Sequence, residues 1–407
     1  WAMVVVLAKL GTSQMVGLYA LGLAVTQPVI SLAQLSLRSV QATDARREYQ
    51  FSDYLRLRLV MLIAALLVIA GVSLEHGSQR ELALVIGIVG LGAAFDAISD
   101  VFYGLQQQHE RMDRIAISMA IKGPLSLVAL SLGVYVTGSV VWAVAGSALA
   151  SALTVAFYDI PAGLSLLRVQ REVVDSVRGL RDGGEPAPQG QTIIRLLWLT
   201  LPMGVTMLLV SLNENMSRYF VEHYLGAGLL GIYAAVASLL RIGGNLGNAL
   251  GQSASPRLAK YYAAGDYPRF KGLLRKLVGM GVVMGASGVL VAAVAGRAIL
   301  RLLFKREYAD HVDVLVWLMA AGGLGYVVSF LGYAITAARR FTIQIAWYGL
   351  AVVITGLTSW WLVPMIGLRG AAVSAFLSEI VVLAGGLAIV AHVLRPPAGS
   401  LPVRTAT

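Results

Sequence analysis

The stretch LRLRLVMLIAALLVIAGVSL, residues 55–74, decides the fold class of this chain. After Arg58 it carries no charged side chain. Its length matches the run of about 20 mostly apolar residues that a helix needs to cross a bilayer core about 30 Å thick. Comparable apolar runs recur along the 407 residues. The sequence therefore predicts an all-α, polytopic membrane protein.

The composition points to the same class. Hydrophobic residues make up 57% of the chain and charged residues 13%, whereas an ordinary globular domain carries about a quarter charged residues. So few charges cannot coat a soluble protein of this size. The net charge of +11 alone would suggest nucleic acid, but membrane proteins collect Lys and Arg in their cytoplasmic loops. We therefore expect membrane lipid as a partner, and no nucleic acid.

Cysteine and histidine usage excludes several kinds of chemistry. The chain has no cysteine, which excludes disulfides, thiolate catalysis and Cys-based metal sites. Its five histidines are scattered, without the spacing of a ligand motif such as HExxH. The sequence therefore predicts neither a metal nor a cofactor, and it carries no catalytic motif.

Apolar runs separated by polar breaks predict eleven complete spans. The apolar stretch 1–10 is interpreted as the outer half of a further helix whose beginning is missing, which makes about twelve. The complete spans are residues 15–37, 55–74, 81–104, 114–137, 139–165, 193–220, 228–252, 272–295, 312–336, 342–362 and 369–394.

The distribution of Lys and Arg predicts the orientation of these spans. Of 32 such residues, 23 lie on one side and 8 on the other, with Arg241 inside a span. The positive-inside rule places the richer side and both termini in the cytoplasm. The outer segment RLLFKREYADH, residues 301–311, is more basic than this rule prefers.

A polar stretch divides the chain into two halves. The segment RVQREVVDSVRGLRDGGEPAPQGQ, residues 168–191, is charged at its start and rich in Gly, Pro and Gln at its end, which is typical of a linker. We predict an N-terminal six-helix lobe over 1–167, a cytoplasmic linker over 168–192, a C-terminal six-helix lobe over 193–395 and a cytoplasmic tail over 396–407.

The two halves share sequence at equivalent places. Three matches occur in the same order: VGLYA at 16–20 with LGIYA at 230–234, DYLR at 53–56 with DYPR at 266–269, and FYGLQQQHER at 102–111 with FLGYAITAAR at 330–339. Both halves have six spans that start on the same side. They therefore form a parallel repeat, related by a pseudo-two-fold axis along the membrane normal.

The repeat also carries two matching polar stripes, each on one helical face. They are Gln27, Ser31, Gln34 and Arg38 in the second helix, and Arg241, Asn245, Asn248 and Gln252 in the eighth. One interpretation is helix packing, helped by Gly243, Gly247 and Gly251 at GxxxG spacing. The other is the wall of a water-filled cavity. Arg241 favours the cavity, because a cation in a packed interface needs a buried anion.

Other ionisable residues lie within predicted spans. Glu214 and Arg218, next to Asn213, can pair with each other at i, i+4, or face a cavity that takes an anionic headgroup or an ion. Asp96 and Asp100 also share one face. These two carboxylates repel unless one is protonated, cation-bound or hydrated.

We therefore predict proton or sodium coupling at Glu214, Asp96, Asp100 and Glu379. The alternative for Asp100 is a shallow position in which water solvates it. Glu379 is placed deeper, in the last helix. Lys122 is expected to extend toward the membrane surface. Pro202 is interpreted as a hinge or as a static kink.

Three stretches resemble a known family: VGLYALGLAVTQPVISLAQLSLRSVQATD at 16–44, DVFYGLQQQHERMDRIAIS at 100–118, and LPMGVTMLLVSLNENMSRYFVEHYLGAGLLGIYAAVASLL at 201–240. They are similar to the bacterial oligosaccharide flippases of O-antigen and exopolysaccharide synthesis. This family belongs to the multidrug/oligosaccharidyl-lipid/polysaccharide exporter superfamily. The resemblance covers essentially the whole chain.

The resemblance implies two lobes around a cationic cavity that work by alternating access in the bacterial cytoplasmic membrane. Its implied cargo is an undecaprenyl-pyrophosphate-linked oligosaccharide, moved from the inner to the outer leaflet. A polysaccharide polymerase and chain-length proteins are implied partners, and H⁺ or Na⁺ a coupling ion. The residues expected to bind the cargo are Arg241, Arg218, Asn213, Asn245, Asn248, Gln252, Gln27, Gln34 and Arg38.

Three alternatives remain open. A cation-coupled multidrug exporter shares the superfamily, but we expect acidic and aromatic residues in its cavity. A lipid II flippase usually has helices beyond twelve. A membrane-embedded polysaccharide polymerase or glycosyltransferase would carry catalytic residues on sizeable outer loops, and the longest outer loop here, about 296–311, has no paired acids set up for catalysis.

Overall fold

The computed structural model describes residues 1–44, 48–77, 79–168, 189–337 and 341–394. Within these residues every regular element is helical, and ten helical segments are long and apolar enough to cross a membrane. One of them, Thr192–Ala263, contains two of the predicted spans. The prediction of an all-α, multi-pass membrane protein is confirmed. Most of the predicted linker and the tail after residue 395 lie outside the described residues.

The helices follow the predicted order. In the first half they are α1 (Ala2–Leu10), α2 (Ser13–Gln34), α3 (Leu37–Thr43), α4 (Phe51–Glu75), α5 (Arg80–Gln108), α6 (Met112–Thr137), α7 (Val140–Thr154) and the π-helix η1 (Val155–Asp159). The second half has α9 (Gln189–Ser238), α10 (Leu240–Ala263), α11 (Tyr267–Leu303), the 3₁₀ helix η2 (Arg306–His311), α12 (Val312–Ala337), α13 (Phe341–Ile366) and α14 (Leu368–Val393).

Three features break the predicted spans. The span expected over 15–37 ends early, because Leu35 and Ser36 adopt left-handed φ values of 49° and 50° and separate α2 from α3. The span expected over 139–165 contains the π-turn η1. The span expected over 228–252 is divided, because α9 ends at Ser238 and α10 begins at Leu240. Hydropathy is averaged over about 19 residues, so it does not detect these three breaks within spans. Gly226, with φ 82° and ψ 172°, bends α9 in the gap that the sequence predicts between the spans 193–220 and 228–252.

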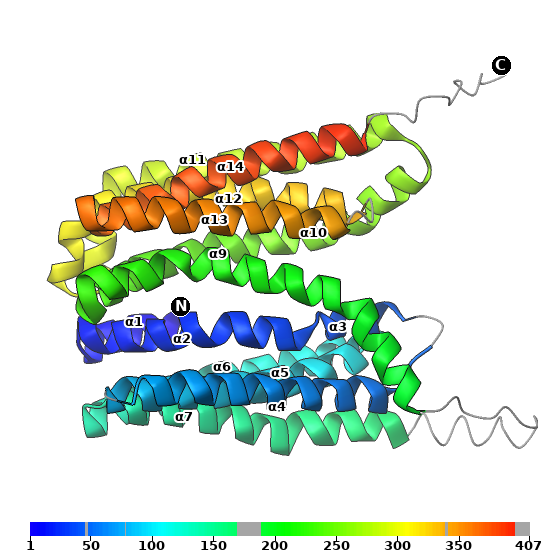
Figure 1. Ribbon diagram of the computed structural model, residues 1–407, viewed down its shortest axis with the longest axis horizontal. Helices are drawn as coiled ribbons and strands as arrows, with labels where there is room; N and C mark the ends of the chain where they lie inside the picture. Colours follow the sequence, from blue (N-terminus) through cyan, green and yellow to red (C-terminus); the bar gives the residue numbers. More distant parts are fainter. Residues whose placement is uncertain (45–47, 78, 169–188, 338–340, 395–407) are drawn as a thin grey trace, which may run out of the picture.

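Figure 1 shows the arrangement of the helices. Helices α1–α7 form one group and α10–α14 another, with α9 running between them. α9 packs on α2 of the first group and on α13 of the second. One hydrophobic core contains residues of both halves, such as Val16 and Leu230. α9 is therefore the main contact between the two groups.

The repeated glycines meet where α2 crosses α9. A Cβ atom on Gly17 would collide with the backbone of Ala227 and Gly231, and one on Gly231 would collide with the backbone of Ser13. Small residues allow helix backbones to approach this closely. The equivalent residues of VGLYA and LGIYA thus lie against each other, as expected where a pseudo-two-fold axis passes between the halves. We call this contact the glycine seam.

A proline-freed carbonyl adds a second contact between α2 and α9. Pro28 lies inside α2 and has no N–H, so the carbonyl of Ala24 lacks its usual helical donor. The hydroxyl of Tyr219 in α9 donates a short hydrogen bond to that carbonyl. Pro28 and this contact between the halves are therefore linked.

The far end of the second half packs differently. Leu258, Phe270 and Trp347 belong to a core made only of residues after position 250. Leu196, at the start of α9, instead joins a core with Leu35 of the first half. At this end α10 therefore packs within its own half, and its opposite face is left uncovered.

Candidate functional site

The polar stripe of α10 lies on an exposed face. Its four side chains, Arg241, Asn245, Asn248 and Gln252, are all exposed.

The glycines of the same helix lie on a different face. Gly243 lies against Tyr326 of α12, and Gly251 against Tyr333 of the same helix. Gly247 and Gly251 are buried. The packed glycine face and most of the polar stripe are therefore separate surfaces. At the end of the stripe, the side chain of Gln252 hydrogen-bonds Tyr333 of α12.

Arg241 lies toward the first half of the protein. Its charge is close enough to interact with Tyr19 of α2 and with Glu214 of α9. A guanidinium in hydrocarbon costs at least about 2.5 to 3.5 kcal/mol. An exposed arginine in this position therefore requires water or an anion beside it.

Arg218 brings a second cation to the same region. Its Nη1 donates to Asn215 Oδ1 at 2.7 Å, and its charge interacts with those of Glu214 and Arg241. The described residues include no ion pair within 4 Å between Glu214 and Arg218, so the local pair, one of the two interpretations of their spacing, is not formed. Instead Arg218 binds an amide one turn away, and the carboxylate of Glu214 is exposed.

Glu379 lies deeper in the second half. It projects from α14 beside Gly325 of α12, and its Oε2 is buried without a hydrogen-bond partner among the described residues. Its charge interacts with that of Glu214. A buried carboxylate without a donor is costly unless it binds a proton or a cation. Glu379 therefore meets the chemical requirement for an ion-binding group.

Asn213 takes part in helix packing. Its Oδ1 accepts hydrogen bonds from Thr355 Oγ1 at 2.6 Å and from Ser378 Oγ at 3.4 Å. Ser217, one turn further along α9, lies 3.2 Å from Ser359 Oγ. Hydroxyl groups therefore join α9, α13 and α14, and the carbonyl oxygen of Asn213 is engaged in this contact.

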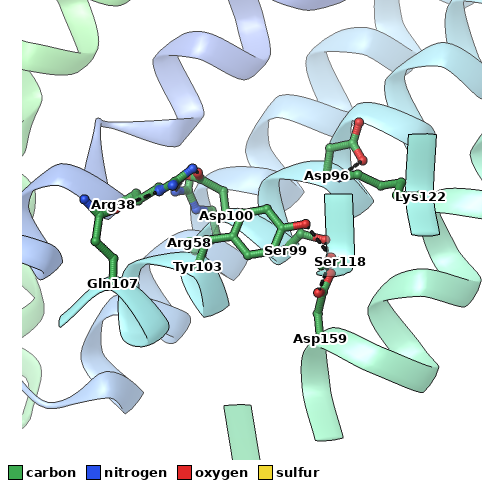
Figure 2. Close-up of polar contacts among 10 residues, drawn as sticks. All are labelled: Arg38, Arg58, Asp96, Ser99, Asp100, Tyr103, Gln107, Ser118, Lys122 and Asp159. Carbon is green, nitrogen blue, oxygen red and sulfur yellow. Dashed lines mark hydrogen bonds and ion pairs between the residues drawn. The ribbon is translucent and has the colours of Figure 1, made fainter. Parts of the chain in front are cut away.

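In the first half, Asp100 holds two arginines (Figure 2). Arg58 Nη2 lies 3.0 Å from Asp100 Oδ2, and Arg38 Nη1 lies 3.5 Å from Oδ1. Arg38 Nε also donates to Gln107 Oε1 at 3.2 Å. Arg58 is completely buried. The break at Leu35 and Ser36 comes just before Arg38. It therefore sets the direction of α3, which places Arg38 against Asp100 and Gln107 of α5.

Asp96 has a separate cation. Lys122 Nζ of α6 donates to Asp96 Oδ1 at 2.9 Å, so the lysine does not extend away to the membrane surface as expected. The ring of Tyr103 lies between the two cationic groups, with Arg38 at 5.5 Å and Lys122 at 5.7 Å from its centroid. Cations from other helices thus offset the repulsion between Asp96 and Asp100.

A third carboxylate of this network was not identified from the sequence. Asp159, at the end of η1, is completely buried. It accepts hydrogen bonds from Ser99 and Ser118, both at 2.6 Å, and Ser118 Oγ lies 2.7 Å from the hydroxyl of Tyr103 (Figure 2). π-turns are frequent at functional sites. The sequence shows Asp159 and Arg58 only as charged residues near the ends of apolar runs. Charges in such positions usually reach water, so their burial was not predicted.

The two polar stripes have different surroundings. Gln27 lines a cavity of about 260 Å³ together with Asp96 and Lys122, between α1, α2, α5, α6 and α7. Gln34 is partly buried at the end of α2. Thus Gln27, Arg38, Asp96 and Asp100 belong to the first half, and Glu214, Arg218, Arg241 and Glu379 to the second. The described residues contain no group of three or more His, Asp or Glu placed to hold a metal ion.

Comparisons with known proteins agree with this architecture. The profile of the family described as polysaccharide biosynthesis protein matches residues 3–262, and the MatE profile matches residues 202–362. The capsular polysaccharide biosynthesis protein CapF of Staphylococcus aureus is 27% identical over 383 residues, which cover 93% of this chain and 91% of CapF.

Two solved structures share the fold. One is the inward-facing conformation of a multidrug resistance MATE family transporter of the MOP superfamily, with a TM-score of 0.72 and 14% identity, covering 96% of this chain and 94% of that one. The other is the lipid II flippase MurJ in an inward closed conformation, with a TM-score of 0.71 and 12% identity, covering 96% and 84%.

Proposed function

The chain belongs to the polysaccharide biosynthesis protein family, and from this premise we propose that it flips a lipid-linked oligosaccharide across the bacterial cytoplasmic membrane. At the coarser level it is a flippase-like transporter of the MOP superfamily. The proposed cargo is an undecaprenyl-pyrophosphate-linked oligosaccharide that moves from the inner to the outer leaflet. The proposed orientation has both termini in the cytoplasm. The activity is transport without catalysis, and a polymerase and chain-length proteins act on the product.

The observation that carries this proposal is the exposed arginine in the polar stripe of α10. Arg241 and Arg218 supply two guanidinium groups, which bind phosphate oxygens with paired hydrogen bonds. The amides of Asn245, Asn248 and Gln252 extend along the same exposed face and suit sugar hydroxyls. A pyrophosphate-linked sugar presents these two kinds of group in sequence.

The contact between the halves suggests how the cargo enters. The glycine seam and the shared core close one end of the molecule, whereas at the other end α10 packs only within its own half. In the proposed orientation, with the termini in the cytoplasm, the uncovered face of α10 would open toward the cytoplasm. Separation of α2 and α9 at the seam, with closure at the other end, would complete alternating access. On this proposal Gln27, Gln34 and Arg38 of the first half also bind the cargo. In the second half, Asn213 binds it beside Arg218.

The test measures which face of the membrane the lipid-linked oligosaccharide reaches, in inverted and right-side-out vesicles. Wild type is expected to move it to the outer face, and Arg241→Ala and Arg218→Ala to stall while still folding and inserting. Arg257→Ala is the matched control, because this exposed arginine lies on the same helix outside the stripe. If wild type leaves the lipid on the cytoplasmic face but extrudes cationic dyes, the chain is a multidrug exporter and the flippase proposal is wrong.

We further propose that carboxylates couple transport to H⁺ or Na⁺. The candidates are Glu379 and Glu214 in the second half and Asp96 and Asp100 in the first. Glu379 has the strongest physical case, since its buried oxygen lacks a donor while Asp96 and Asp100 already contact cations. Glu379→Gln is expected to abolish the response of transport to an imposed proton or sodium gradient. An unchanged gradient response in this variant would exclude Glu379 from coupling.

A further inference from the structure

A group of arginines lies at the end of α11, outside the proposed transport site. Along one face of this helix, Leu290 and Val294 are 64% and 80% exposed. Arg297 and Arg301 continue that face at i+7 and i+11 from Leu290 and are exposed as well. An exposed apolar stripe on a membrane helix faces lipid. The two arginines therefore follow it at the level where lipid headgroups begin.

The next turn adds a third arginine. Arg301 and Arg306 line an open hollow of about 480 Å³. Between them in the chain, Lys305 donates a short hydrogen bond to the carbonyl of Gly11, at the junction of α1 and α2. This bond ties the segment to the first half. The hollow thus has a defined position on the surface.

These three arginines have no carboxylate partner in the part of the chain that the structure describes. Glu307 and Asp310 are exposed in η2, yet neither lies within ion-pair distance of them. Asp313 is taken by Arg369, at 2.6 Å. A basic residue in the last turn of a helix interacts favourably with the helix dipole, which accounts for Arg301 alone. Among the described residues, no carboxylate or helix terminus stabilises the charges of Arg297 and Arg306.

We propose that Arg297, Arg301 and Arg306 form a binding site for the phosphate of an anionic phospholipid. Guanidinium groups bind phosphate oxygens through paired hydrogen bonds, and the exposed apolar stripe beside them accommodates acyl chains. This stripe favours a lipid over a free phosphate ion. The site also explains why the segment 301–311 is more basic than the positive-inside rule prefers.

The experiment measures lipid retention by the full chain. Protein is purified in a mixture of phosphatidylglycerol and phosphatidylcholine, and the retained lipids are counted by native mass spectrometry. Each arginine at an anionic surface contributes about 1 kcal/mol, or roughly fivefold in affinity. R297Q/R301Q/R306Q is therefore expected to weaken phosphatidylglycerol binding by about two orders of magnitude. The basic residues at the start of α11 are unchanged in both proteins.

Single variants provide the matched control. Arg301→Gln is expected to weaken phosphatidylglycerol binding about fivefold. Arg369→Gln, which removes the same charge from an arginine already paired with Asp313, is expected to leave it unchanged. Inorganic phosphate should not displace the bound lipid. Equal retention by wild type and the triple variant, equal loss in both single variants, or displacement by inorganic phosphate would each overturn the proposal. Lipid retention is read independently of transport.

Discussion

The glycine seam gives a sharp prediction, Gly231→Ala. The added methyl group would overlap the backbone of Ser13 and Gly17 in α2. Backbone atoms of a helix cannot rotate away as a side chain does, so α2 and α9 must move apart. Overpacking of this kind typically costs about 1–3 kcal/mol. We expect a loss of that size in the free energy of unfolding, measured by denaturant titration in detergent micelles.

Gly228→Ala is the matched control for this change. Gly228 lies on the same helix three residues away, and an added Cβ there meets nothing within 4 Å. We expect its effect to stay within about 0.5 kcal/mol of wild type. If Gly231→Ala is as stable as Gly228→Ala, the two helices do not approach as closely as described, and the seam does not hold the halves together.

Three further predictions concern buried polar contacts. Arg58→Met removes the closer of the two cations on Asp100, which keeps Arg38 at 3.5 Å, and is expected to lower the free energy of unfolding by about 1.5–3 kcal/mol. Arg111→Met at an exposed pair should not change the unfolding transition measurably; similar transitions for both variants would contradict a stabilising contact at Arg58. Tyr219→Phe removes the donor to the Ala24 carbonyl and should cost about 1 kcal/mol in the same titration, unless another group satisfies that carbonyl. Asp159→Ala leaves two serine hydroxyls without their acceptor and should lower the free energy of unfolding by about 1–3 kcal/mol; a neutral result would show that the serines find other partners.

Much of the fold follows from local patterns. The run at residues 55–74 predicts a membrane span, and α4 covers Phe51–Glu75, because hydropathy depends only on neighbouring residues. The matches VGLYA and LGIYA predict related halves, and their glycines meet in the seam. Local patterns predict the break near Gly226 but do not predict every helix break. The two left-handed residues after Gln34 are Leu35 and Ser36, and neither is a Gly or a Pro that would mark a break in the sequence.

The candidate residues divide in the same way. Helical periodicity places Arg241, Asn245 and Asn248 on one face from the sequence alone. Their exposure, however, depends on α10 packing against α12 through its glycines. Likewise, i, i+4 spacing permits a pair between Glu214 and Arg218, but the arginine binds Asn215. Spacing along a helix limits which contacts are possible, and the surrounding packing selects the one that forms.

The sequence by itself determined that this protein spans a membrane many times, that its two halves are related, and which family it resembles. These properties rest on composition and on order along the chain. Only the tertiary structure decided which charges have partners. Asp100 meets Arg58 across 42 positions, and Asp159 meets Ser99 across 60. Burying a charge is costly unless it is paired, so these contacts form where helices distant in sequence pack together.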